Sequence, residues 1–497
     1  MQGRLSREID RAVLAFALGV AVLASSISFA QTSSKLASDV HETVLRGGRV
    51  IDPESGLDAV RDVGIDNGVI TAISAEGLQG RRIVDVSGLV VAPGFIDLDT
   101  YARLGRFHVA DGVTTIINFR VGTADVDAWY SQHTGRMPVN FGIAVGFLPI
   151  RVEVVGKTEP DVGYDPRVVD EDQLLEILRR MERGLVQGAI GVGMGGAKLR
   201  GPTNRELLET FQLAARYEAP VSATLRDIIW ADADVAPVFS EWLGAAALTG
   251  VSLHIPHLPS SAGPYTERLL EMIGRARARG FDVTAEGYPY TGSVNSLDYA
   301  ADELLEWTDD ELQDVLLLAT NERLVRDDIL IYRTRDPGIV FLNSYIAPFV
   351  DASIASPLTS IASHGWLDDQ LRGHPRTSGT YSKVLGRHVR EQARLTLMEA
   401  LRKMSLMPTQ RLELRVPAMK KKGRLQVGAD ADIVIFDANQ IIDRATFQEP
   451  TLPPEGVHYV FVNGIAVVSE GSVQEGVHPG EAIRSPLHGQ RSGTVDE

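Results

Sequence analysis

Polar side chains follow directly after apolar runs at several points of the chain, where a strand would end and a loop begin. Asp99 and Tyr101 follow "PGFIDL", Arg120 follows "GVTTIINF", His257 lies in "LHIPHL", and His364 follows "LTSIAS". A carboxylate and two imidazoles form a ligand set used in open metal sites. A carboxylate and a guanidinium instead form a charge-assisted ion pair. Which of the two sites forms depends on where Arg120 lies.

The middle of the chain alternates β-rich runs with segments of helical periodicity. One predicted helix is 171–183, with Leu174, Leu175, Leu178 and Met181 on one face, and others are 205–217 and the segment that begins at the capping-box residue Thr396. Eight such units favour an α/β fold with a closed (β/α)8 TIM barrel, which places residues at the C-terminal strand ends close together. The eight predicted strands are 90–98, 112–119, 140–147, 188–194, 219–225, 251–258, 281–288 and 358–365.

Short β runs separated by Gly, Asp and Asn turns occur near both ends of the chain. We therefore predict a small β-sandwich domain formed by the N- and C-terminal segments 42–92 and 415–475, with the barrel at 93–414.

The N-terminus has three arginines, an apolar run at 12–23 and small residues up to Ala30, which is typical of a secretory signal peptide at 1–30. We expect a periplasmic or secreted protein with no membrane span after cleavage, and an uncleaved anchor is the alternative. The net charge of -16 argues against nucleic acid as a partner, and the absence of cysteine excludes disulfides and thiolate ligands.

The chain resembles the amidohydrolase superfamily, and within it the N-acyl-D-amino-acid deacylases of the D-glutamate type. The stretches that carry the resemblance are "VVAPGFIDL", "DGVTTIINFRVG", "QGAIGVGMGGA", "LHIPHLPSS", "VTAEGYPYTG", "GHPRTSGTYSKVLGRHV" and "GRLQVGADADIVIFD". The resemblance implies one or two divalent metal ions, usually zinc, at the mouth of the barrel. Such an ion lowers the pKa of a bound water, so that hydroxide attacks an amide.

The resemblance also places the ligands of that metal centre, and nearly all of those places are changed. Its His-x-His pair falls on Asp99 and Tyr101, its bridging region on Asn118 and Arg120, and its last Asp on His364, whereas His257 is kept, with His254 shortly before it on the same strand. The replaced positions are Asp99, Tyr101, Arg120, Phe147, Thr224 and His364. Because a guanidinium has no lone pair to offer a metal, the change indicates the loss of the centre.

We therefore expect no cofactor, and a metal-free, ion-paired barrel mouth built from Asp99, Arg120 and His364. The alternative is an atypical site for one Zn ion on Asp99, His257 and His364, which would hydrolyse C–N amide bonds. A third possibility is a metal-free enzyme with Asp99 or His364 as general base.

The resemblance places four substrate-contacting residues: Arg376, Tyr288, Tyr290 and Arg226. Arg376, with His374 close before it, is the best candidate to bind a carboxylate with two hydrogen bonds, and support of the barrel rim is the other interpretation of these residues. The function expected is an exported, non-catalytic amidohydrolase-fold protein that binds a small acylated amino acid or peptide, or that partners an active relative. An N-acyl-D-amino-acid deacylase is the alternative.

Overall fold

The computed structural model describes residues 40–156, 168–195, 202–225, 235–313, 315–318, 322–335, 340–344 and 347–486. The predicted signal peptide at 1–30 and the predicted substrate residue Arg226 lie outside these ranges. Among the described helices, none combines the length and the apolar character needed to cross a bilayer.

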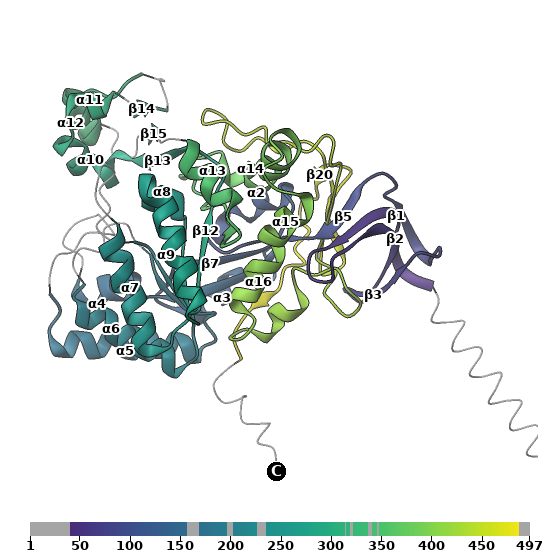
Figure 1. Ribbon diagram of the computed structural model, residues 1–497, viewed down its shortest axis with the longest axis horizontal. Coiled ribbons are helices and arrows are strands. Elements are labelled where there is room, and N and C mark those ends of the chain that lie inside the picture. Colours follow the sequence, from purple (N-terminus) through teal and green to yellow (C-terminus); the bar gives the residue numbers. More distant parts are fainter. Residues whose placement is uncertain are drawn as a thin grey trace, which may run out of the picture.

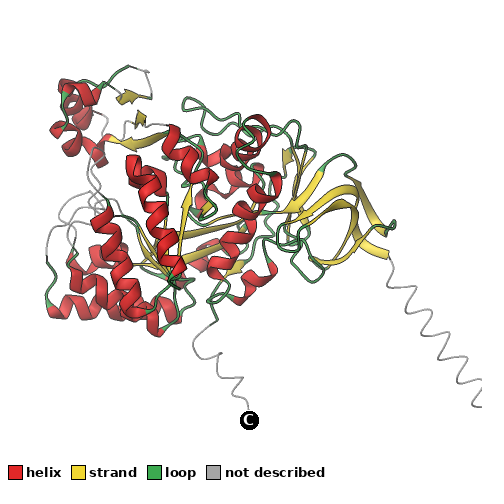
Figure 2. Cartoon of the chain, in the orientation of Figure 1, coloured by secondary structure: helices red, strands yellow, loops and turns green. Residues whose placement is uncertain are grey.

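A parallel eight-stranded barrel forms the centre of the molecule, as predicted (Figures 1 and 2). Neighbouring strands follow the chain order from the first barrel strand to the last, which is typical of successive βα units. Within the described residues no hydrogen-bonded ladder joins the first strand to the last. The barrel strands are β6 (Phe95–Asp97), β7 (Val113–Thr123), β8 (Asn140–Gly146), β9 (Val192–Met194), β10 (Val221–Ala223), β11 (Leu253–Ile255), β12 (Val283–Gly287) and β16 (Thr359–Ile361), and the short β21 (Ala482–Ile483) adds to β8.

Helices cover the outside of the barrel (Figure 2). They are α2 (Gly105–Ala110), α3 (Val126–His133), α4 (Phe147–Val155), α5 (Glu171–Val186), α6 (Asn204–Arg216), α7 (Ala236–Thr249), α8 (Leu258–Ala262), α9 (Thr266–Ala278), α13 (Ala347–Ala355), α14 (Arg376–Lys383), α15 (Leu397–Leu401) and α16 (Met407–Leu412). Two π-helical segments, η3 (Val384–Glu391) and η4 (Arg402–Leu406), and three 3-10 turns, η1 (Ala102–Leu104), η2 (Gly263–Tyr265) and η5 (Pro417–Lys421), complete this layer.

The helix α5 shows where the predicted packing face needs correction. Its start is fixed by a capping box between Asp170 and Gln173. Leu174 and Met181 face the core with Ile177, but Leu175 is 57% exposed. Each residue of a helix turns the side chain by about 100°, so positions three and four apart share a face and a neighbour in sequence does not.

A second sheet of nine strands is built from both ends of the chain and encloses its own apolar core (Figure 1). Its strands are β1 (Val40–Asp52), β2 (Leu57–Asp66), β3 (Val69–Ser74), β4 (Gln79–Asp85), β5 (Val90–Pro93), β17 (Ile433–Phe436), β18 (Val457–Val462), β19 (Ile465–Ser469) and β20 (Ser472–Val473). Most pairs are antiparallel, while β1 pairs in parallel with β4 and β5.

The strand predicted at 90–98 belongs to both sheets. Its first half, β5, pairs with β17, and its second half, β6, pairs with β7. Gly94 lies between them, and a Cβ atom there would be 2.2 Å from Cγ2 of the buried Thr114. Only glycine therefore lets the chain pass from one sheet to the other at this point.

An insertion between β12 and β16 was not predicted from the sequence. It contains β13 (Gly292–Ser296), α10 (Leu297–Glu306), α11 (Asp309–Leu312), β14 (Val315–Leu317), α12 (Arg326–Arg335) and β15 (Val340–Ser344). The three strands form an antiparallel sheet in the order β13-β15-β14, and Leu297, Leu304 and Val315 contribute to a small separate core. In Figure 1 this part stands beyond the end of the barrel, at the upper left.

Lys403, in η4, gives the stability of the fold a predictable pH dependence. Its ammonium is buried and donates to the carbonyl of Ser356 and to Oγ1 of Thr359, and burial lowers the pKa of Lys403 from 10.5 to about 7. Between these values the unfolded chain binds a proton that the folded chain has released, so stability should rise with pH. We expect urea denaturation midpoints to increase from pH 7 to pH 10, and Lys403→Met to flatten that increase. An equal slope in the variant would contradict this assignment.

Candidate functional site

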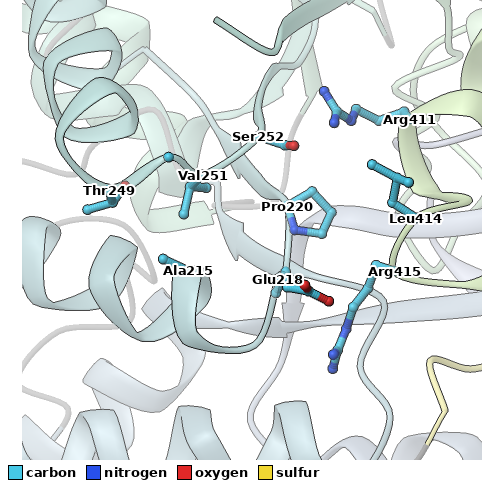
Figure 3. Close-up of a pocket in the computed structure, with 11 residues that line it drawn as sticks. Ala215, Glu218, Pro220, Thr249, Val251, Ser252, Arg411, Leu414 and Arg415 are labelled. Atoms are coloured by element: carbon cyan, nitrogen blue, oxygen red, sulfur yellow. The ribbon is translucent and has the colours of Figure 1, made fainter. Parts of the chain in front are cut away.

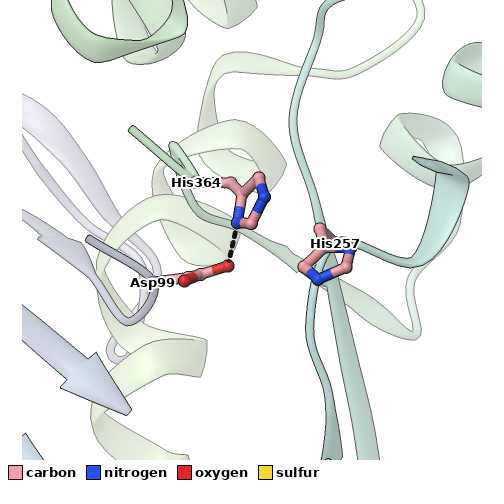
Figure 4. Close-up of side chains that lie close together, drawn as sticks. All are labelled: Asp99, His257 and His364. Carbon is pink, nitrogen blue, oxygen red and sulfur yellow. Dashed lines mark hydrogen bonds and ion pairs between the residues drawn. The ribbon is translucent and has the colours of Figure 1, made fainter. Parts of the chain in front are cut away.

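Three of the predicted site residues meet at the C-terminal ends of barrel strands (Figure 4). Asp99 follows β6, His257 follows β11 and His364 follows β16. One ligand-type atom from each lies within 4.8 Å of the others. The barrel thus brings together residues that are more than a hundred positions apart in the sequence.

Asp99 is the centre of the cluster and both of its carboxylate oxygens are occupied. Oδ1 accepts a hydrogen bond from Nε of Arg120 at 2.9 Å, and Oδ2 accepts one from Nδ1 of His364 at 2.5 Å. Burial alone would raise the pKa of Asp99, but the nearby Arg120 and His364 hold it well below its ordinary value. Asp99 is therefore an anion held between two donors.

Arg120 faces Asp99, which answers the question that the sequence left open. Its Nη2 also lies 3.4 Å from the hydroxyl of Tyr101. Room for this arginine comes from Gly193 in β9 and Gly195 directly after it: a Cβ atom on Gly195 would lie 2.4 Å from Cγ of Arg120, and one on Gly193 would lie 2.6 Å from its carbonyl oxygen. These two glycines therefore leave room for the backbone and the side-chain stem of Arg120.

The two histidines are both neutral. Burial lowers the pKa of His364 to about 4 and that of His257 well below its ordinary value, and their rings lie 4.3 Å apart between centroids. Nδ1 of His257 contacts the hydroxyls of Ser261 at 2.8 Å and Ser260 at 3.1 Å, which turns Nε2 toward the site. Both residues have left-handed backbone, with φ of 36° at His257 and 49° at His364. Such conformations cost free energy and tend to occur at functional positions.

The donor set has the right chemistry for zinc, but its arrangement does not fit the ion. Ligands of a tetrahedral zinc lie roughly 3.3 Å apart, because each is about 2.0–2.2 Å from the metal. Oδ2 of Asp99 and Nδ1 of His364 are only 2.5 Å apart and share a hydrogen bond. The Arg120 cation, on the other oxygen of Asp99, would repel a divalent ion.

Of the predicted substrate residues, Arg376 and Tyr288 join the cluster. Nε of Arg376 donates to the carbonyl of His364 at 2.5 Å, and Cζ lies 4.6 Å above the ring of Tyr288. The Tyr288 ring in turn stacks on His364 with 5.9 Å between centroids. Nη1 of Arg376 is buried and has no hydrogen-bond partner among the described residues. A buried cationic donor of this kind is suited to bind an anionic oxygen.

Tyr290 contacts the rim of the barrel rather than the cluster. Its hydroxyl donates to Oδ2 of Asp443 at 3.3 Å, and Nζ of Lys383 lies 3.7 Å above its ring. The nearby His374 bonds the carbonyl of Gly292 through Nε2 at 2.9 Å. These contacts match the rim-support interpretation of "GYPY" and "GHPR".

Phe147 and Thr224 stand at two of the replaced ligand positions and are both buried. Phe147 is the first residue of α4 and belongs to the main core. Thr224 is 1% exposed, and its hydroxyl has no hydrogen-bond partner among the described residues. Neither side chain takes part in the cluster around Asp99.

Buried polar residues beside the cluster were not singled out from the sequence. Glu286, at the end of β12, places Oε2 3.0 Å from Nε2 of His254, whose Nδ1 contacts the hydroxyl of Thr284 at 2.8 Å. Burial raises the pKa of Glu286 well above its ordinary value and lowers that of His254 to about 3, so both are neutral. Asp97 and His108 form a second buried pair, 3.3 Å apart. The available signal was an acidic residue inside an apolar strand, as in "FIDLD" and "VTAEG".

A pocket of about 320 Å³ lies at the opposite end of the barrel, before β10 and β11 (Figure 3). Its lining includes Pro220, Ser252 and Leu414, and the guanidinium of Arg411 there is paired with Asp282. In barrels of this type the N-terminal strand ends serve stability and the C-terminal ends serve chemistry. The cluster around Asp99 is therefore the candidate site.

The barrel with polar residues at its C-terminal strand ends resembles the amidohydrolase fold. Residues 346–468 match the model of the amidohydrolase family. The chain is 29% identical to N-acyl-D-glutamate deacylase and 27% identical to D-aminoacylase, both of Alcaligenes xylosoxydans xylosoxydans. These alignments cover 89% and 90% of this chain and 96% and 98% of the relatives. The family model, the relatives and the fold together support an amidohydrolase of the D-aminoacylase branch.

A solved structure of a relative has a similar fold. The N-acyl-D-glutamate deacylase of Bordetella bronchiseptica, complexed with zinc and a phosphonate inhibitor that mimics the tetrahedral intermediate, matches with a TM-score of 0.77 and 25% identity. The match covers 90% of this chain and all of that one. That relative therefore holds zinc in the same fold.

Proposed function

We propose that this chain is an exported, metal-independent member of its branch that binds N-acylated amino acids or short acylated peptides without hydrolysing them. One observation carries the proposal: Nε of Arg120 and Nδ1 of His364 occupy both oxygens of Asp99. A cation fixed to the chain thus neutralises the carboxylate at the barrel mouth, in a fold in which a relative of this branch holds zinc. Without a metal-bound hydroxide the cluster has no nucleophile for an amide.

The ligand class follows from the donors that remain. Nη1 of Arg376 is a buried cationic donor without a hydrogen-bond partner among the described residues, and the apolar Tyr288 ring lies beneath the guanidinium. A ligand with a carboxylate and an uncharged acyl group satisfies both, which matches the N-acyl-D-glutamate named for two relatives. The arginine-flanked apolar run at the N-terminus supports export to the periplasm or beyond.

The test combines metal analysis, ligand binding and product release on the purified chain. N-acetyl-D-glutamate is expected to raise the melting temperature equally with and without EDTA, while D-glutamate, which lacks the acyl group, has less effect. No zinc should co-purify and no acetate should be released. Stoichiometric zinc together with acetate release would overturn the proposal.

The second candidate function is a deacylase with zinc on Asp99, His257 and His364. The convergence of their ligand-type atoms within 4.8 Å is the observation that favours it. It requires Arg120 to leave Asp99. If it holds, zinc should be present in the purified protein and absent from His257→Ala.

Arg376 should carry most of the affinity for the ligand. Arg376→Ala removes the charged hydrogen bond from Nη1, which contributes about 1.5–3 kcal/mol, so the Kd for N-acetyl-D-glutamate should rise roughly 10-fold to 150-fold. Isothermal titration would measure this, with Arg49→Ala, in the exposed pair with Asp58, as the matched control. Arg376→Lys keeps the charge but not the fork and should fall between. Unchanged affinity in a folded Arg376→Ala protein would rule out this role.

A further inference from the structure

The seam of the barrel between its first and last strands is joined by side chains. Strands β6 and β16 are the two ends of the eight-stranded order, and no ladder joins them in the part of the chain that the structure describes. Asp99 and His364, which are hydrogen-bonded to each other, come from opposite sides of this seam. Something other than the sheet must therefore hold them together.

Asp97 bridges the seam through the backbone. Its Oδ1 accepts hydrogen bonds from the backbone N–H of Asp99 and from that of Ser363, both at 3.1 Å. The side chain is fully buried, so water does not compete for these bonds. One carboxylate oxygen thus binds the chain at Asp99 and the chain immediately before His364.

His108 bridges the same two segments through their hydroxyls. Its Nε2 lies 3.0 Å from Oγ1 of Thr100 and 3.0 Å from Oγ of Ser363. Nδ1 lies 3.0 Å from the carbonyl of Leu104, which can only accept, so Nδ1 carries a proton. A Cβ atom on Gly365 would lie 3.0 Å from the ring of His108, which explains why a residue without a side chain follows His364.

We propose that Asp97 and His108 are positioning residues that form a clasp across the β6–β16 seam and set the hydrogen bond between Asp99 and His364. Thr100 and Ser363, the residues that His108 bonds, are direct neighbours of Asp99 and His364. The clasp also holds the left-handed backbone of His364, whose φ is 49°. The inference concerns the ion-paired site proposed above and does not depend on what the site binds.

Proton NMR of the metal-stripped, ligand-free chain can test the clasp directly. A hydrogen bond of 2.5 Å between an imidazole and a carboxylate should give a strongly downfield Nδ1–H resonance, identified by its absence from His364→Asn. His108→Ala and Asp97→Ala should lose or broaden that resonance. Asp97→Asn keeps the oxygen that accepts both amides and should retain it.

The control separates positioning from general loss of stability. Thr210→Ala removes a buried hydroxyl of α6, outside the site, and should leave the resonance in place. A resonance that persists in both His108→Ala and Asp97→Ala, is lost equally in Thr210→Ala, or is missing from the unsubstituted chain would overturn the clasp. Failure of the proposed function would instead appear in the zinc content and acetate release, which this spectrum does not measure.

Discussion

Replacing Arg120 by alanine should cost about 3–5 kcal/mol of unfolding free energy in metal-free buffer, because removing one partner of a buried ion pair leaves the other charge buried and uncompensated. Asp99 is 3% exposed, and among the described residues its carboxylate would keep only the hydrogen bond from Nδ1 of His364. Urea denaturation at neutral pH in the presence of EDTA would measure the loss. Arg49→Ala, in an exposed pair, should cost no more than about 1 kcal/mol.

Zinc should reverse part of this loss in Arg120→Ala and not in the unsubstituted chain. Without the guanidinium, Asp99, His257 and His364 are a carboxylate and two imidazoles with no cation among them. At a free zinc concentration of about 100 times its Kd, binding to the folded state alone adds about 2.7 kcal/mol. One zinc per chain should be retained by Arg120→Ala, and none by Arg120→Ala/His257→Ala. Equal zinc binding with and without Arg120 would show that the arginine does not take the place of the ion.

Changing Glu206 to glutamine should lower the free energy of unfolding as much as Arg120→Ala does, although Glu206 is outside the site. Its Oε2 accepts from Nε of Arg151 at 2.8 Å, and both side chains are 1% exposed. Its Oε1 accepts from the backbone of Thr203 in the capping box of α6. Glutamine keeps the cap but removes the negative charge that faces the buried Arg151, so we expect a loss of about 3–5 kcal/mol in urea denaturation.

A double variant distinguishes the lost charge pair from lost packing. In Arg151→Met/Glu206→Gln the cap remains and both charges of the pair are removed, so most of the stability should return. Glu171→Gln breaks an exposed pair with Arg205 and should change stability by less than about 1 kcal/mol. A double variant that is no more stable than Glu206→Gln would contradict the explanation.

The sequence predicted the elements of the barrel better than their boundaries. Strand and helix periodicities are local properties of the sequence. The spacing of Thr396 and Glu399 is local as well, and the capping box that it predicted is present in the structure. The division of 90–98 between two sheets at Gly94 was not visible, because both halves are apolar and extended. The core face of α5 was assigned only in part, since Ile177 rather than Leu175 completes it.

The residues of the candidate site could be named from the sequence, but only the structure shows where their side chains point. The sequence allowed both an ion pair and a metal ligand set that include Asp99, and the structure adds that Arg120 is directed at Asp99. Asp97 and Glu286 were missed because an acidic residue in an apolar strand has no pattern that tells whether it faces a partner. That information comes from packing across the seam, between segments far apart in the chain.

Under the proposed function, the ion pair of Arg120 with Asp99 would also change what the protein requires from its surroundings. A zinc ion has to be acquired from outside, competes with other metals and can be removed by a chelator. A guanidinium is synthesised with the chain and stays charged throughout the physiological pH range. In the metal-independent function proposed above, a barrel mouth that carries its own cation is complete once it has folded, and neither metal starvation nor metal excess should alter its charge.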